Sequence, residues 1–224
     1  MRSGKTGGEL AGHDAARRFE TLAEMGVADL FNQGMVCLTR LIVPDVLAAY
    51  DFSGIGRLMD VGGGHGELLG AILDAYPSLR GVIYDLPHCA DGARRHLAEA
   101  GVADRCDFVG CSFFESVPPG TDAIVMKSII HDWDDEKSLV ILRNCRRALG
   151  AGGRVLLVER IMPDAPKPMP GDRATALSDL NMLCGPGGRE RTEREFRELL
   201  ARGGFGMTRV VSTGQFYLIE AAPV

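Results

Sequence analysis

The sequence lacks the features that mark several common protein classes. Its six cysteines form no CxxC pair, so zinc-module spacing is absent and a disulfide framework is not expected. No apolar run reaches the roughly 18–20 residues that span a bilayer, and the glycine-rich start has no apolar segment of a secretory signal. Basic residues are not in excess, because the net charge is −5. We therefore expect a cytoplasmic protein with reduced thiols and no nucleic-acid or membrane partner.

The composition that is present is typical of a folded globular protein. Hydrophobic residues make up 46% and charged residues 25% of the 224 residues, which are enough for one compact domain with a short appendage. Residues 1–14 are polar and are predicted to be disordered or tag-like. Residues 15–50 carry apolar residues at helical spacing and predict a helical linker segment of two or three helices. Residues 51–224 are predicted to form the main domain.

Short apolar runs alternate with amphipathic stretches through this main domain. The runs include "RLMDVG", "GVIYDL", "DFVGC", "DAIVMKS" and "GRVLLVER". Such alternation predicts an α/β fold with a doubly wound, Rossmann-like, mostly parallel sheet. The last two runs, "MTRVVST" and "QFYLIEA", are too close for a helical crossover and predict an antiparallel C-terminal hairpin, which completes a seven-stranded sheet.

A glycine-rich loop follows the first predicted strand, in "LMDVGGGHGELL". The lysine of a P-loop is missing, and in a GxGxxG pattern starting at Gly62 the third glycine would fall on Glu67. Glu67 and the nearby Asp60 would repel a pyrophosphate at the start of the helix. They would not repel S-adenosylmethionine, which carries a sulfonium, an ammonium group and no phosphate. A tight strand–helix turn without a ligand is the alternative.

An acid ends the second predicted strand, in "VIYDLPH". Asp85 lies 23 residues after Gly62, where doubly wound nucleotide binders place an acid on the ribose hydroxyls. A structural cap before Pro87 is the alternative reading of Asp85.

A histidine stands at the end of another predicted strand, in "VMKSIIHDWDDE". Ligands of open α/β sheets bind at the carboxyl ends of strands, so His131 is expected near the ligand crevice, where a neutral imidazole can accept a proton from a hydroxyl. A metal ligand or a purely structural histidine are the alternatives. Among the neighbouring acids, Asp132, Asp134 or Asp135 could cap the following helix.

Taken together and in order, "DVGGGHG", "YDLPH", "MKSIIHDWDDE", "VERIMPD" and "GGRERTEREF" resemble the class I S-adenosylmethionine-dependent O-methyltransferases. The resemblance is strongest to the plant caffeic-acid and flavonoid type with its bacterial natural-product relatives, and it extends from about residue 17 to the end. It implies an enzyme that transfers a methyl group from S-adenosylmethionine to a hydroxyl oxygen of an aromatic or polyketide-like small molecule.

The resemblance also implies roles for individual residues. The catalytic histidine of the family falls on His131, and the two acids that orient it fall on Glu159 and Glu190. Glu159 ends the strand next to the one that precedes His131, so its carboxylate can hold the ring; Glu190 could instead be a first-turn helix acid, like Glu193. The expected cofactor contacts are Asp60, Gly62, Gly64, Asp85, Leu86, Ser112, Phe113 and Lys127. The expected substrate contacts are Asp132, Trp133 and Met182, and no metal is expected.

The sequence also departs from the family pattern. Ser112 stands where the family often has an acid on the adenine, and the expected loop "LNMLCGPGG" is one residue shorter than in the plant proteins. The N-terminal dimerisation domain of the family is expected to be missing, so a homodimer is expected to be weakened. Three rival functions remain: a truncated homologue that binds S-adenosylmethionine without methyltransferase activity, the same scaffold with decarboxylase or hydroxylase chemistry, and an NAD-dependent dehydrogenase.

Overall fold

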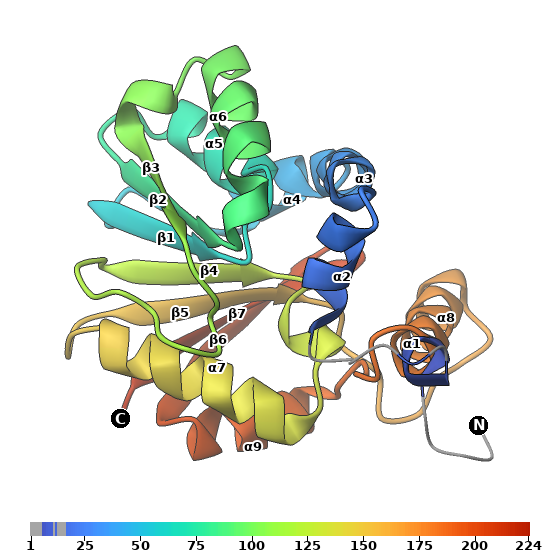
Figure 1. The fold of residues 1–224 in the computed structure, drawn as a ribbon. Helices are drawn as coiled ribbons and strands as arrows, with labels where there is room; N and C mark the ends of the chain where they lie inside the picture. Colours follow the sequence, from blue (N-terminus) through green and yellow to red (C-terminus); the bar gives the residue numbers. More distant parts are fainter. Residues whose placement is uncertain (1–5, 11, 13–16) are drawn as a thin grey trace.

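A seven-stranded sheet with helices on both faces forms the body of the chain (Figure 1). The computed structural model describes residues 6–10, 12 and 17–224. The strand order is β3-β2-β1-β4-β5-β7-β6. The strands are β1 (Arg57–Val61), β2 (Arg80–Asp85), β3 (Cys106–Gly110), β4 (Ala123–Lys127), β5 (Arg154–Glu159), β6 (Phe205–Thr213) and β7 (Phe216–Pro223).

The pairing of these strands confirms the predicted fold class. Strands β1 to β5 pair in parallel, whereas β7 is antiparallel to both β5 and β6. The central strands are almost fully buried, as expected of parallel strands with both faces covered, and this is why they read as continuous apolar runs. The turn between β6 and β7 contains Gly214, at φ 75°, a conformation that favours glycine.

Two apolar clusters form the core, one on each face of the sheet. One face carries α4 (Val43–Ala49), α5 (Glu67–Ala75) and α6 (Ala90–Glu99), with buried side chains such as Val46, Leu69 and Leu97. The other face carries α7 (Asp135–Ala148) and α9 (Glu193–Arg202), with Leu142 and Phe196. Short 3-10 turns, η2 (Pro87–Cys89), η3 (Ala103–Arg105) and η4 (Ile130–Asp132), follow β2, precede β3 and follow β4.

Helices also form within residues 15–50, where a helical linker segment is expected. Helices α2 (Arg18–Glu24) and α3 (Ala28–Arg40) lead into α4 and lie beside the carboxyl ends of the central strands (Figure 1). No single described helix is long and apolar enough to cross a membrane, although α3 and α4, bent by 49° to each other, meet the length and composition criteria as a pair.

The predicted disorder of residues 1–14 falls largely outside the described residues. Within that range the structure describes one helical turn, α1 (Gly7–Leu10). Thr6 and Glu9 cap this turn reciprocally: the Thr6 amide donates to Glu9 Oε2 at 2.7 Å, and the Glu9 amide donates to Thr6 Oγ1 at 3.1 Å. The cap supplies the local reason for this turn.

Helix α8 (Pro170–Cys184) was not predicted from the sequence. The segment "LNMLCGPGG" was expected to be a loop, and this is wrong for its first five residues, which form the last turn of α8. The physical reason is that Leu177, Leu180 and Leu183 remain exposed, so the apolar residues of α8 do not mark one buried face.

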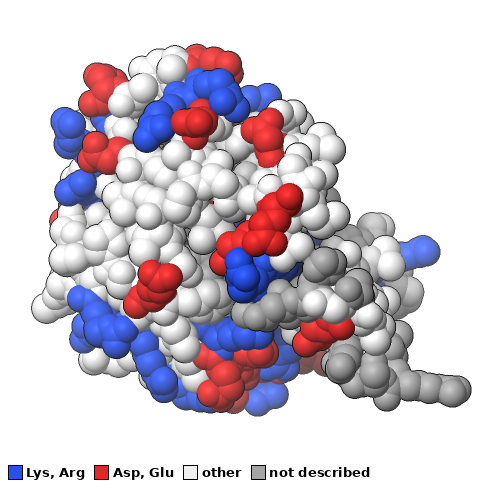
Figure 2. Space-filling view, viewed as in Figure 1, with Lys and Arg blue, Asp and Glu red and all other residues white. Residues whose placement is uncertain are grey.

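Charged side chains of both signs are interspersed on the face shown in Figure 2, where they gather toward its upper and lower ends. Uncharged side chains cover most of the surface between them, with acidic and basic side chains also near the middle, so basic side chains do not cover this face continuously.

Candidate active site

One cavity of about 630 Å³ opens at the carboxyl ends of the strands, where the strand order reverses between β1 and β4. This is the place where open α/β sheets bind ligands, and the volume is typical of a small-molecule site. All the residues predicted to contact cofactor or substrate line it, and so does His131. Glu159 and Glu190 are not part of the lining; their carboxylates lie next to His131 Nδ1.

The glycine loop between β1 and α5 has a backbone that side chains would disrupt. Gly62, Gly64 and Gly66 have φ of 75°, 57° and 82°. A Cβ atom on Gly62 would lie 2.4 Å from Ile129 Cδ1, and one on Gly66 would lie 2.3 Å from Ile83 Cδ1. The loop therefore exposes bare backbone to the cavity, as a ligand cradle requires.

Two acids lie beside this loop, the buried Asp60 and the partly buried Asp85. Burial, the neighbouring Asp85 carboxylate and, in the opposite direction, Lys127 bring the pKa of Asp60 to about 7. Asp60 forms no ion pair within the described part of the chain. A cationic ligand group would relieve this situation, whereas a phosphate would aggravate it.

Asp85 performs a structural task in addition to facing the cavity. Its Oδ2 accepts the Gly64 amide at 2.7 Å, and its Oδ1 accepts the Leu86 amide at 2.6 Å. Burial raises the pKa of Asp85, and these two amides oppose the rise. The Asp85 carboxylate therefore fastens the glycine loop to the end of β2, which is a structural role. Its expected contact with the ribose hydroxyls stays a prediction.

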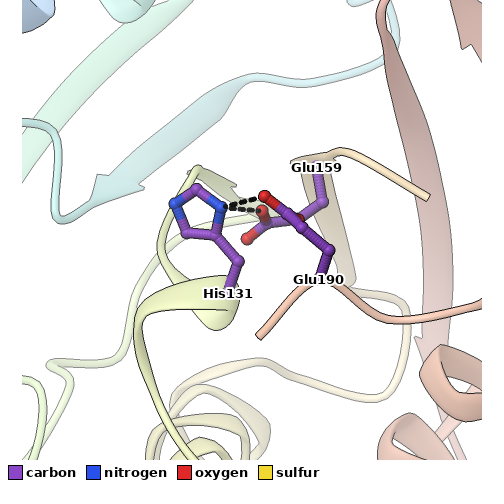
Figure 3. Close-up of side chains that lie close together, drawn as sticks. All are labelled: His131, Glu159 and Glu190. Atoms are coloured by element: carbon purple, nitrogen blue, oxygen red, sulfur yellow. Dashed lines mark hydrogen bonds and ion pairs between the residues drawn. The ribbon is translucent and has the colours of Figure 1, made fainter. Parts of the chain in front are cut away.

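His131 is presented by η4, directly after β4. Its Nδ1 lies 3.1 Å from Glu190 Oε1 and 3.8 Å from Glu159 Oε2 (Figure 3). The His131 side chain is 11% exposed and both glutamate side chains are 0% exposed. Figure 3 shows the second ring nitrogen on the opposite edge, away from both glutamates. The ring is thus held at Nδ1. Nε2 lies 3.9 Å from Asp132 Oδ1, beyond hydrogen-bond distance, and can still bind a ligand.

The charges around the ring favour its protonated form. Burial alone would lower the pKa of His131, but Glu159, Glu190 and Asp132 outweigh it and raise the pKa to about 9. Burial raises the pKa of Glu159, and the His131 charge opposes this rise. The two glutamates can therefore stabilise an imidazolium that forms when the ring takes up a proton.

The backbone around His131 is fixed by Glu159. Its Oε1 accepts the amides of Ile129 at 3.0 Å and Ile130 at 2.8 Å. Glu159 ends β5, next to β4, as expected from the sequence. One oxygen of this carboxylate thus holds the turn, while the other faces the ring.

The segment 188–191 presses against the same turn. The Arg189 amide donates to the His131 carbonyl at 2.9 Å. The fully buried Arg191 donates to the carbonyls of Ile130 at 2.9 Å and Trp133 at 2.8 Å. Gly188 packs so closely that a Cβ atom there would lie 2.0 Å from the His131 carbonyl oxygen. Glu190 is therefore delivered by a segment in fixed register with the turn that it serves.

Two of the alternatives left open by the sequence are decided by helix boundaries. Helix α9 begins at Glu193, so Glu190 lies before the helix and is not a first-turn acid. Asp134 caps α7, because its Oδ1 accepts the Lys137 amide at 2.8 Å.

The metal alternative concerns the same triad. Of the described residues, only His131, Glu159 and Glu190 form a group whose possible ligand atoms lie within 4.8 Å of one another. The hydrogen bond at Nδ1 and the two amides on Glu159 account for this cluster without an ion. The absence of a metal stays a prediction.

Trp133 packs against three phenylalanine rings, one of which belongs to Phe113, an expected cofactor contact. Its ring centroid is 4.8 Å from that of Phe114, 6.1 Å from Phe113 and 6.2 Å from Phe19. All four rings belong to residues that line the cavity, so the cluster forms an aromatic wall of that cavity.

Several lining residues were not identified from the sequence. They come from the N-terminal helices and from α8, and include Arg18, Phe19, Asn32, Met35, Thr39, Ser178 and Asn181. Lys127 Nζ donates to Thr39 Oγ1 at 3.0 Å, and Arg18 Nη1 lies 3.4 Å from Asp132 Oδ1. Only Phe19 carried a signal, as part of an apolar pattern at helical spacing.

Comparison with known proteins places these features in one family. Residues 16–206 match the O-methyltransferase domain family. The chain is 43% identical over 208 residues to the phenazine O-methyltransferase PhzM of Lysobacter antibioticus, covering 92% of this chain and 60% of that protein. It is 41% identical over 194 residues to caffeic acid 3-O-methyltransferase of Catharanthus roseus, covering 85% of this chain and 51% of that protein.

A solved structure agrees with these sequence comparisons. The crystal structure of an O-methyltransferase from neocarzinostatin biosynthesis, in complex with S-adenosylmethionine and 2-hydroxy-5-methyl naphthoic acid, has a TM-score of 0.83 and 33% identity. The match covers 92% of this chain and 60% of that one. This chain thus spans only 51–60% of the length of these relatives. The matched residues, the fold and the retained motifs together show that the chain belongs to the O-methyltransferase domain family.

Proposed function

We propose that this chain transfers a methyl group from S-adenosylmethionine to a hydroxyl oxygen of an aromatic or polyketide-like small molecule, with His131 as general base. The observation that carries the proposal is the imidazole of His131, which two buried glutamates hold at one nitrogen beside a cavity that also contains the glycine loop. Relatives named for phenazine and caffeic acid, and one solved with a hydroxylated naphthoic acid, support an aromatic acceptor.

The residues at the glycine loop fit S-adenosylmethionine. Asp60 and Asp85 offer one buried and one partly buried carboxylate to cationic and hydroxyl groups, and Gly62 and Gly64 leave room for close approach of the ligand to the backbone. When bound, S-adenosylmethionine supplies an electrophilic methyl group on a sulfonium. The rest of the reaction depends on groups that belong to this chain.

His131 would take the acceptor proton at Nε2, the nitrogen that faces away from both glutamates (Figure 3). The O–H electron pair would stay on oxygen and form the new bond to the methyl carbon, while the C–S bond breaks and its electron pair leaves with sulfur as a neutral thioether. The proton stays on the imidazole. Glu159 and Glu190 stabilise the resulting cation. The cavity walls hold the oxygen in line with the methyl group, and proximity of this kind supplies most of the rate enhancement.

Transfer of labelled methyl groups from S-adenosylmethionine to a panel of phenols tests the proposal. Incorporation into a phenolic oxygen supports it. Cofactor binding without transfer would favour the non-catalytic homologue instead, and release of carbon dioxide or hydroxylation would favour the same scaffold with different chemistry.

Turnover is expected to rise with pH. The base must be neutral to accept a proton, and its pKa is raised to about 9, so below that value most of the enzyme carries the inactive imidazolium. At saturating cofactor and acceptor, kcat should reach half its maximum near pH 9 and level off about one pH unit above that value. Ionisation of the acceptor is controlled by the same measurement with His131→Gln, and a flat wild-type profile would contradict the assignment of the base.

Replacing Asp85 by alanine is expected to weaken cofactor binding about 10–100-fold. The change removes the acceptor proposed for the ribose hydroxyls and also releases the Gly64 amide from its 2.7 Å hydrogen bond. Calorimetric titration with S-adenosylmethionine measures the effect. Asp91→Ala, an exposed acid on α6 that pairs with Arg94, is the control and should bind as the wild type does.

A further inference from the structure

Helix α8 makes two contacts with the glutamate that holds His131. Ser178 Oγ lies 2.6 Å from Glu190 Oε1, the same oxygen that lies 3.1 Å from His131 Nδ1. The Glu190 amide also donates to Asp179 Oδ1 at 2.9 Å. Neither Ser178 nor Asp179 belongs to the roles expected from the sequence, and Ser178 lines the cavity.

The direction of these hydrogen bonds follows from the chemistry of the acceptor. An ionised carboxylate only accepts, so the Ser178 hydroxyl and the His131 Nδ1–H both donate to Glu190 Oε1. Glu190 Oε2 is buried and has no hydrogen-bond partner among the described residues. Ser178 is thus the second donor, beside the imidazole, to a carboxylate that is 0% exposed.

We propose that Ser178 is a positioning residue for the base: by donating to Glu190 it sets how strongly, and in which orientation, that carboxylate holds the His131 ring. A carboxylate that accepts two donors divides its charge between them. If Ser178 is removed, the charge of Glu190 acts on the imidazole alone. The ring then keeps its proton to higher pH, and less of the neutral base is present at a given pH.

The other groups that face His131 do not change when Ser178 is removed. They are Glu159 from β5 and Asp132 from η4, and Asp132 pairs with Arg18 of α2 at 3.4 Å. The carboxylates of Glu159, Asp132 and Glu190 all favour the protonated ring. A change confined to the donor on Glu190 should therefore move the His131 titration upward.

The direct test is an NMR titration of the imidazole signals, because it needs neither cofactor nor turnover. The chain has five histidines, so the His131 signal can be assigned by its loss in His131→Gln. In Ser178→Ala, the His131 midpoint should move up by about half to one pH unit. Ser178→Thr keeps the hydroxyl and should restore the wild-type midpoint. Thr175→Val removes another α8 hydroxyl, one that donates to the Gly171 carbonyl at 3.2 Å, and should leave the midpoint unchanged.

A second variant covers the case in which Ser178→Ala does not fold. Ser178→Cys is nearly isosteric and donates more weakly, so it should give a smaller upward shift. An unchanged midpoint in a folded Ser178→Ala or Ser178→Cys protein, or a shift of equal size in Thr175→Val, would overturn the proposal.

The kinetic arm rests on the proposed function. In Ser178→Ala the alkaline rise of kcat should move upward by the same interval as the NMR midpoint, while the KM for S-adenosylmethionine stays near the wild-type value. A uniform fall in kcat with no shift along the pH axis would mean that Ser178 is merely structural and would also overturn the proposal. If the wild-type chain transfers no methyl group, the proposed function fails, whereas the NMR titration still decides the role of Ser178.

Discussion

Replacing His131 by alanine is expected to lower methyl transfer by about 10²–10⁴-fold while S-adenosylmethionine still binds. The His131 ring presents its second nitrogen on the side away from Glu159 and Glu190, whereas both glutamates are directed at the ring (Figure 3). Neither glutamate can therefore replace the imidazole as the base. Most of the expected cofactor contacts lie on the glycine loop, at the end of β2 and after β3, on segments of the chain other than the His131 turn. The fall should therefore appear in kcat, with little change in the dissociation constant of the cofactor.

Single-turnover assays and calorimetry separate these two effects for His131→Ala. The substitution also leaves two buried carboxylates without their cation, so His131→Gln, which retains a polar side chain, is measured beside it. His96→Ala is the matched histidine control, because His96 lies on α6 and does not line the cavity. Its Nε2 lies 2.8 Å from Glu67 Oε2. Turnover near the wild-type rate in folded His131→Ala would rule out the base.

Replacing Gly188 by alanine is expected to cost about 10²-fold in methyl transfer, because a displacement of the base of about 1 Å is enough for such a loss. The added Cβ would lie 2.0 Å from the His131 carbonyl oxygen, 2.5 Å from the Asp132 carbonyl carbon and 2.7 Å from the Trp133 amide nitrogen. All three are backbone atoms that cannot rotate away. The turn and the segment 188–191 must separate, and the free energy of unfolding should fall by about 1–3 kcal/mol.

Gly152→Ala is the control for Gly188→Ala. A Cβ atom on Gly152 meets nothing within 4 Å, so this variant should keep both wild-type stability and wild-type turnover. Denaturant unfolding and steady-state kinetics measure both quantities for each variant. Normal activity of Gly188→Ala would show that the close packing of the segment 188–191 on the His131 turn does not position the base.

Much of the fold could be predicted because its buried strands carry the pattern directly. Strands β4 and β5 are apolar runs of the length of a strand, and the close spacing of β6 and β7 requires a hairpin. Helix α8 could not be predicted in the same way. Its leucines remain exposed and its buried residues are Thr175 and Met182, so neither its apolar nor its polar residues form a regular face.

The site divides along the same line. Asp60, Asp85, His131 and Glu159 lie at strand ends, where topology alone brings them together. Thr39 meets Lys127 across 88 residues of sequence, and no local pattern records such a contact. Ser178 was missed for a related reason: a single serine in a helix without a regular apolar face becomes informative only when Glu190 is found 2.6 Å away.

The tether at one nitrogen of His131 has a consequence for product distribution. With Nδ1 committed to Glu190, a polyhydroxylated acceptor can surrender a proton only at the opposite ring edge. The modified position is then the hydroxyl that the aromatic wall steers to that edge, whatever the relative acidity of the other hydroxyls. Under the proposed reaction, the chain should therefore yield one regioisomer from substrates that free base in solution would methylate as mixtures.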